Sequence, residues 1–67
     1  MTLDDLLKLQ IALNHILEDM VDSSDFTILD KYGFIKYNLI NGVQYIQYPN
    51  KKDVLDILND INKILER

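Results

Sequence analysis

His15 is the only histidine in the sequence, and Glu18 and Asp19 follow it at spacings of three and four residues. On a helix these spacings place the imidazole beside two carboxylates, an arrangement that can orient a general base for proton transfer. Catalysis of this kind also needs a nucleophile and a pocket, and no Ser or Thr in the chain stands in a nucleophile motif. We therefore predict a solvated histidine that pairs with Asp19, in a protein that is not an enzyme.

Acidic residues are concentrated around the end of the same predicted helix: Glu18, Asp19, Asp22, Asp25 and Asp30. Carboxylates bind hard cations, but residues 22–25 lack the alternating ligands and central glycine of a calcium loop, so we expect no metal and no cofactor. Acids at a helix C-terminus oppose the macrodipole, and a preference for turns does not explain Glu18 and Asp19. Three interpretations stay open: a solvated connection, a docking site for basic residues, including mimicry of nucleic acid, and a weak cation site.

Lys51 and Lys52 stand at the predicted start of a second helix, where basic side chains also oppose the helix dipole. A basic pair at this position can bind an anion. Two lysines are a weak signal, however, and a solvated surface is the simpler explanation.

Two amphipathic helices are predicted to position these side chains, at about residues 2–21 and 51–66. In the first, Thr2 is suited to the N-cap and Asp5 stands at the capping-partner position. Apolar residues then recur at spacings of three and four, as on one face of a helix. The second segment repeats the capping pattern and has a cleaner apolar side.

The segment between the helices is rich in Phe, Tyr, Ile and Val, and it predicts strands at about residues 26–29, 34–40 and 43–48. A turn at Gly33 joins the first two strands, and Asn41-Gly42 joins the second and third through a type I′ turn. The expected fold is α+β. It is a two-layer α-β-β-β-α arrangement, in which a three-stranded antiparallel meander has two helices packed on one face.

The register of the hairpin decides which side chains face the helices. A two-residue turn pairs Ile40 with Val43, and further along it pairs Tyr37 with Ile46. A slip by one residue would mix polar side chains into both faces. The face expected to turn inward holds Phe26, Ile28, Ile35, Tyr37, Leu39, Ile46 and Tyr48.

The outward face mixes polar and apolar side chains. Ordinary β-propensity near turns can produce this mixture, but surfaces that bind partners also have it. We predict that this face contacts a partner. The candidate residues are Leu29, Phe34, Lys36, Asn38, Ile40, Val43 and Tyr45.

The chain has 67 residues, no cysteine and a net charge of −4, and it predicts one domain over residues 1–67. A domain of this size is marginal as a monomer, and no disulfide compensates for its small core. Leu7 and Ile11 fall outside the core stripe of the first helix, and a second copy of the chain would cover them. A homodimer is therefore one expected arrangement.

The acidic balance disfavours binding to nucleic acid and to anionic membranes, and it suits a basic protein partner. With no long apolar run and an acidic N-terminus, the chain is expected to be a cytoplasmic protein. The leading functional prediction is a small acidic, non-enzymatic protein-protein interaction module, inhibitor- or regulator-like. It would bind a macromolecular partner through the outward sheet face, the acidic end of the first helix, or both. The alternative is an obligate homo-oligomeric structural or assembly subunit.

Overall fold

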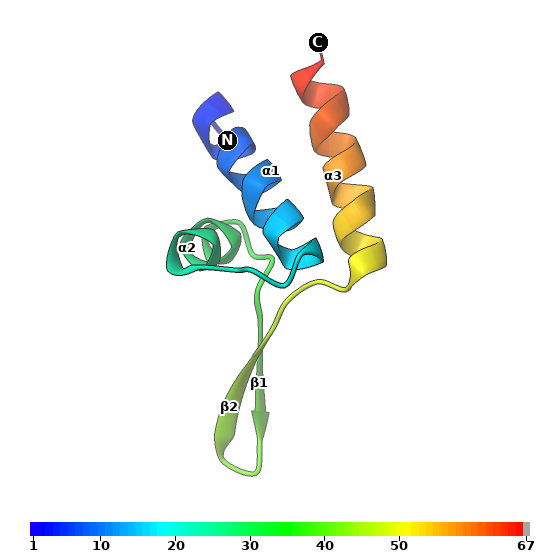
Figure 1. Cartoon of the computed structure of the whole chain (residues 1–67). Helices are drawn as coiled ribbons and strands as arrows, with labels where there is room; N and C mark the ends of the chain where they lie inside the picture. The colour runs from blue at the N-terminus through cyan, green and yellow to red at the C-terminus, as the bar shows by residue number, and fades with distance from the viewer. Residues whose placement is uncertain (67) are drawn as a thin grey trace.

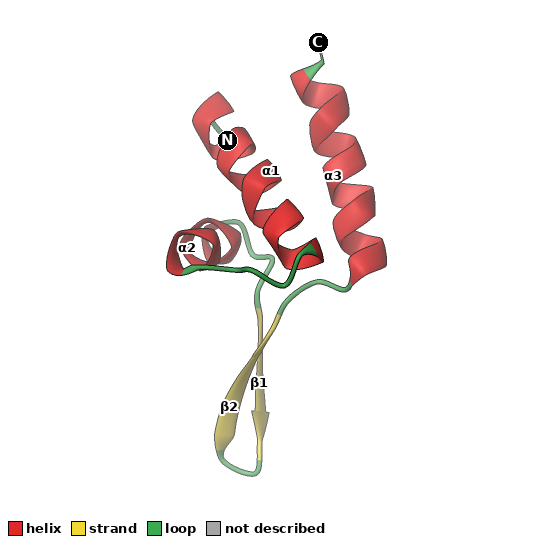
Figure 2. Cartoon of the chain, viewed as in Figure 1, coloured by secondary structure: helices red, strands yellow, loops and turns green. Residues whose placement is uncertain are grey.

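The chain forms three helices and one β-hairpin, as seen in a computed structural model that describes residues 1–66 (Figures 1 and 2). In chain order the elements are α1 (Leu3–Leu17), α2 (Ser23–Lys31), β1 (Lys36–Ile40), β2 (Val43–Gln47) and α3 (Lys51–Leu65). The fold is therefore α+β, with a two-stranded antiparallel sheet.

The core lies among the three helices, where α1 packs against both α2 and α3. Apolar side chains from each helix meet there and are almost fully buried: Leu9, Ala12, Leu13, Ile16, Ile28, Leu29, Val54, Leu58 and Ile61. Ile35, which precedes β1, is the point where the hairpin segment enters this core. The helices thus form the stable body from which the hairpin starts.

The first helix begins as predicted but ends four residues earlier. The Thr2 hydroxyl accepts a hydrogen bond from the Asp5 amide, which confirms the predicted N-cap. At the other end, Asp19 has a φ of 54°, and the Met20 amide donates to the His15 carbonyl at 2.9 Å. This is a Schellman C-cap, in which the left-handed position favours glycine, asparagine or aspartate. Asp19 therefore does have a local structural role, which the sequence analysis did not assign to it.

Residues 26–29 lie in helix α2, so the predicted three-stranded meander is not confirmed. Asp22 and Asp25 form a reciprocal capping box, which starts a helix where the sequence analysis expected no helix. Gly33, with a φ of 76°, ends this helix, and the Phe34 amide bonds to the Leu29 carbonyl at 2.9 Å. The sequence analysis placed a turn between two strands at Gly33, but this residue caps a helix instead.

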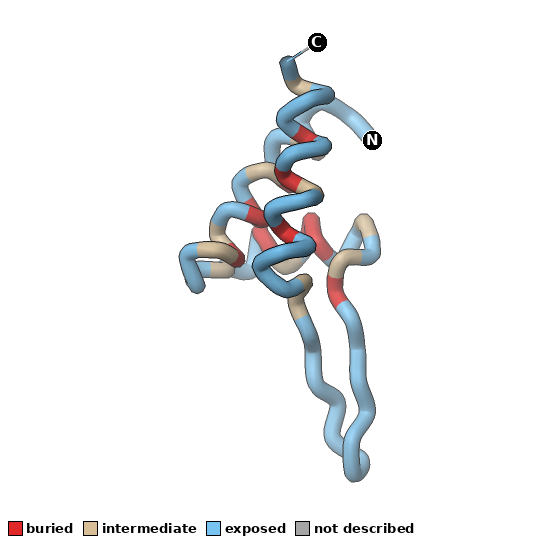
Figure 3. The backbone as a smooth tube through the Cα atoms, turned by 90° about the vertical axis from the view of Figure 1, so that its right-hand side faces the viewer, coloured by how far each residue is buried: buried red, intermediate tan, exposed pale blue. Residues whose placement is uncertain are grey.

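The hairpin has the predicted register, but the helices do not cover its inward face as predicted. Ile40 pairs with Val43 and Tyr37 with Ile46, across a turn in which Asn41 and Gly42 both have positive φ. The hairpin projects away from the helical body, which gives the molecule an extended shape of 46 × 22 × 18 Å (Figures 1 and 3). Every residue of both strands is exposed. The helices do not pack on a face of the sheet as expected.

Candidate functional site

The hairpin carries an unusual amount of exposed apolar surface. Between 48% and 75% of the surface of each of six large apolar residues is accessible: Tyr37, Leu39, Ile40, Val43, Tyr45 and Ile46. Single exposed apolar residues are common, but a contiguous group is typical of an interaction site. The hairpin is therefore the leading candidate for a functional surface.

The inner face of the hairpin, as the sequence analysis named it, holds Tyr37, Leu39, Gln44 and Ile46. The prediction that the helices cover this face is wrong for Tyr37, Leu39 and Ile46, which are all exposed. Only Ile35 and Tyr48, at the base of the hairpin, pack against the core. An apolar stripe thus continues from the core out along the hairpin into solvent.

The outer face of the hairpin holds five of the seven predicted sheet-face residues. They are Lys36, Asn38, Ile40, Val43 and Tyr45, and all of them are exposed. The Asn38 side-chain amide donates to the Gln47 side-chain oxygen at 3.0 Å across this face.

The other two predicted sheet-face residues lie elsewhere. Leu29 is fully buried in α2, and Phe34 packs partly buried against the core. They serve the fold because residues 26–34 form a helix and its cap instead of a strand and a turn. Neither residue belongs to the exposed hairpin surface.

The five predicted acidic residues do not form one patch. Asp25 is buried, Asp22 is the N-cap of α2, and Asp30 lies at the far end of that helix. Asp30 accepts a hydrogen bond of 2.6 Å from the Tyr37 hydroxyl, which raises the pKa of Tyr37. Only Glu18, Asp19 and Asp22 remain exposed together at the end of α1.

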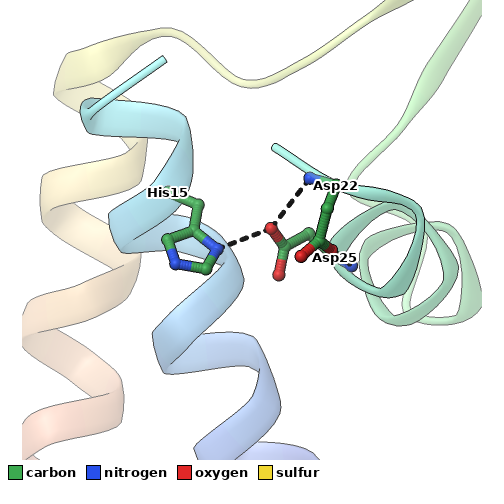
Figure 4. A group of neighbouring side chains, drawn as sticks. All are labelled: His15, Asp22 and Asp25. Atoms are coloured by element: carbon green, nitrogen blue, oxygen red, sulfur yellow. Dashed lines mark hydrogen bonds and ion pairs between the residues drawn. The ribbon is translucent and has the colours of Figure 1, made fainter. Parts of the chain in front are cut away.

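His15 pairs with Asp25, as Figure 4 shows, whereas the sequence analysis expected it to pair with Asp19. The Nδ1 atom of His15 lies 2.6 Å from an Asp25 carboxylate oxygen, and that oxygen also accepts from the Asp22 amide at 3.1 Å. The hydrogen bond to Asp25 is the main cause that raises the pKa of His15, although partial burial acts in the opposite direction. The pair ties α1 to the start of α2.

His15, Asp22 and Asp25 each offer one potential metal ligand atom, and the three atoms lie within 4.8 Å of one another. An imidazole and two carboxylates are a donor set that zinc accepts. In this fold, however, both carboxylates already serve the capping box of α2, where Asp22 accepts from the Asp25 amide at 2.9 Å. The cluster therefore has a complete structural explanation as a helix cap joined to an imidazole.

A second polar contact joins the opposite ends of α1 and α2. Asp5 accepts hydrogen bonds from the Tyr32 hydroxyl and from the Lys31 ammonium group, the latter at 3.2 Å. The Tyr32 hydrogen bond is the main cause that lowers the pKa of Asp5, with further lowering by Lys31 and Lys8. Like the His15 pair, this contact fixes how α2 lies against α1.

Acidic residues are absent from the hairpin and from the residues on either side of it. Residues 31–52 contain four lysines and no Asp or Glu, so this segment carries +4. Only Lys36 lies on the hairpin, because Lys31 ends α2 and Lys51 and Lys52 begin α3. Since the whole chain carries −4, the remaining residues carry −8. A hollow of about 330 Å³ lies at the base of the hairpin, and its lining includes Phe34, Lys36, Tyr48 and Ile57.

Two functional features escaped the sequence analysis. The His15–Asp25 pair depends on α2, whose capping box at Asp22 and Asp25 the sequence analysis did not identify. The exposure of Tyr37, Leu39 and Ile46 could not be predicted from local sequence. The alternation of apolar and polar residues along the strands fits a face that packs under helices equally well.

Comparison of the chain with protein-family models, curated proteins and solved structures gives no match. Among residues 1–66, no helix is both long enough and apolar enough to cross a membrane.

Proposed function

We propose that this chain is a non-enzymatic protein-protein interaction module, inhibitor- or regulator-like, that binds a macromolecular partner through its hairpin. The observation that carries this proposal is the exposure of both hairpin faces, with six large apolar side chains each at least 48% accessible. An apolar patch of this kind on a small body is the usual mark of a contact surface.

The composition of the hairpin supports the same function. It combines two tyrosines with aliphatic side chains and has a single charged residue, Lys36. The centres of protein interfaces are enriched in aromatic residues and depleted in acids. The acidic end of α1 is the weaker candidate, because Asp25 is buried against His15 and Asp30 bonds to Tyr37.

The position of the hairpin also suits docking. Both chain termini lie at the opposite end of the molecule from the hairpin (Figure 1). A partner can therefore approach the tip and both faces without meeting the acidic helical body, whose residues carry most of the negative charge.

A capture experiment with matched variants tests the proposal. The protein is immobilised through an N-terminal tag, which lies away from the hairpin, and any captured protein from its natural host is identified, purified and titrated directly. Tyr45→Ala is expected to weaken the measured affinity at least about tenfold, as for an aromatic anchor. Leu55→Ala is the control, since Leu55 is a similarly exposed apolar residue on α3.

Circular dichroism must first show that both variants keep their helices. Equal affinity of the wild type and of a folded Tyr45→Ala, Ile40→Ala double variant would refute docking through the hairpin. Loss of binding in Leu55→Ala instead would move the site to α3.

A further inference from the structure

The cluster of His15, Asp22 and Asp25 has ligand atoms that the capping box of α2 does not use. Asp22 accepts the Asp25 amide through Oδ1, and Asp25 accepts the Asp22 amide and contacts the His15 ring through Oδ2. The second oxygen of each carboxylate has no hydrogen-bond partner among residues 1–66. The cap therefore explains why the three side chains meet, and it leaves two carboxylate oxygens available.

The unpaired oxygen of Asp25 belongs to a carboxylate that is almost fully buried. Asp25 is only 5% exposed, which is rare for an aspartate. Among the described residues, no side-chain oxygen or nitrogen that is sealed from solvent lacks a hydrogen-bond partner. The unpaired oxygen is therefore reached by solvent. A largely desolvated carboxylate attracts a cation more strongly than one on an open surface.

The cluster opens into a hollow of about 240 Å³. His15, Asp22 and Asp25 all line this hollow, together with Ser24. The imidazole reaches it from α1 and the two carboxylates from the start of α2, so that their polar atoms converge (Figure 4). One potential ligand atom from each residue lies within 4.8 Å of the other two. The hollow has room for an ion and its water ligand.

The charge around the hollow favours a cation. Glu18 and Asp19 are exposed at the end of α1, close to the exposed Asp22. Lys8, which also lines the hollow, is already paired with Asp4 at 3.1 Å. A cation near the C-terminus of α1 also interacts favourably with the helix dipole, which the acids at that end oppose.

We propose that His15, Asp22 and Asp25 form a binding site for a divalent transition metal, and that zinc fits it best. One imidazole nitrogen and two carboxylate oxygens match the three-ligand sites of zinc, in which water takes the fourth position. Calcium takes about six to eight oxygens, and magnesium keeps an octahedral oxygen shell, so neither suits a site with a nitrogen ligand. The inference goes beyond the proposed function and does not depend on it.

Small shifts convert the hydrogen-bonded cluster into a tetrahedral site. Zinc bonds of about 2.0 Å place tetrahedral ligand atoms about 3.3 Å apart. The His15 Nδ1 and Asp25 Oδ2 atoms, which are 2.6 Å apart, therefore separate by about 0.7 Å. Asp22 is exposed, so a small side-chain rotation brings in its second oxygen. The ion replaces the proton between His15 and Asp25, and that proton passes to solvent.

The expectation of no metal came from the lack of a calcium-loop pattern in residues 22–25. That pattern describes ligands within one loop, whereas His15 belongs to a different helix from Asp25. The weak cation site that the sequence left open is the interpretation adopted here, with His15 as the additional ligand.

Calorimetric titration with zinc chloride tests the site on the protein without a histidine tag, since such a tag would itself bind zinc. One equivalent is expected to bind with a dissociation constant below about 100 μM. Asp22→Asn is expected to raise this constant at least about tenfold, because asparagine caps a helix as well as aspartate does but has no carboxylate. His15→Gln, which keeps a hydrogen-bond donor for Asp25, is expected to have the same effect.

Asp19→Asn is the matched control. It removes the same charge from the same end of α1, and asparagine tolerates the positive φ of this position. Its dissociation constant is expected to stay within about threefold of the wild-type value, which is the effect of one screened charge. In NMR spectra of the wild type, zinc is expected to shift the amide signals of residues 15 and 22–25 and to leave those of α3 unchanged.

Three results would overturn the proposal. The first is no binding by the wild type at about 1 mM zinc. The second is an equal loss of affinity in Asp19→Asn and Asp22→Asn, which would indicate diffuse attraction to an acidic surface. The third is unchanged binding in folded His15→Gln and Asp22→Asn variants, which would place zinc elsewhere. None of these results bears on the hairpin, whose test measures binding to a protein partner.

Discussion

At the scale of residues, the His15–Asp25 contact determines how stability responds to pH. The pKa of His15 is raised above its ordinary value of 6.5, chiefly by the hydrogen bond to Asp25, with smaller contributions from Asp22 and Glu18. A raised pKa means that the stabilising charge is fully present below about pH 6.5 and is lost as the pH rises through the folded-state pKa. We predict that the free energy of unfolding of the wild type decreases over this range.

His15→Gln keeps a hydrogen-bond donor for Asp25 but does not titrate. Urea unfolding of both proteins between pH 5.5 and 9 gives the comparison, because the other titrating groups are common to both. The difference in unfolding free energy is expected to shrink as the pH rises. A difference that stays constant across this range would show that the pKa of His15 is the same in the folded and unfolded protein, so that Asp25 does not raise it.

Tyr32 is expected to control the ionisation of Asp5. Its hydroxyl is the main cause that lowers the pKa of Asp5, so Tyr32→Phe should move that pKa upward, toward or beyond the ordinary value of 3.8. Carbon-13 NMR of the Asp5 carboxyl measures the change directly. The stabilisation from a lowered carboxyl pKa is present above 3.8 and is lost as the pH falls through the folded-state value, so the two proteins should converge in stability in acid. An unchanged Asp5 pKa would place the cause with Lys31 instead.

At the scale of elements, the burial of two leucines shows the difference between the core and the exposed hairpin. Leu29 is fully buried on α2, whereas Leu39 on β1 is 75% exposed. Leu29→Ala is expected to cost about 2–5 kcal/mol of stability, and Leu39→Ala less than about 0.5 kcal/mol at a concentration where the chain is monomeric. Urea denaturation measures both. A small effect at Leu29 would show that α2 does not pack on α1.

The two amphipathic end segments and the hairpin register could be predicted from the sequence because their signals are local. The cap at Thr2, the apolar periodicity and the Asn41-Gly42 turn each act within a few residues. Residues 26–29 could not be assigned by composition, because β-branched and aromatic residues also occur in short helices whose caps are strong. The capping box of Asp22 and Asp25 outweighs the β-propensity of the residues that follow it.

The candidate site was predicted only in part, for a physical reason. The register sorts side chains onto two faces, but it carries no information about which face a helix covers. In this fold Ile35 and Tyr48 reach the core and the rest of the stripe does not, because the hairpin leaves the helical body at its base. Whether a helix packs on a face of the hairpin depends on contacts between distant parts of the chain, and no local sequence pattern encodes these contacts.

At the scale of the whole molecule, the chain divides into an acidic helical body and an apolar hairpin that contains no acid. The body carries the core, and the hairpin contributes little to it beyond Ile35 and Tyr48. This division lets the exposed strands vary in their contacts without unfolding the helices. It is also why binding through the hairpin is the central claim about function.

Hydrogen exchange of four hairpin amides tests that claim most directly. The amides of Tyr37 and Leu39 on β1, and those of Gln44 and Ile46 on β2, lie outside the ladder that joins the two strands and should exchange rapidly in the free protein. When a captured and purified partner is added to saturation, we predict slower exchange at these amides. Exchange that stays rapid at all four amides with the partner bound would contradict binding through the hairpin.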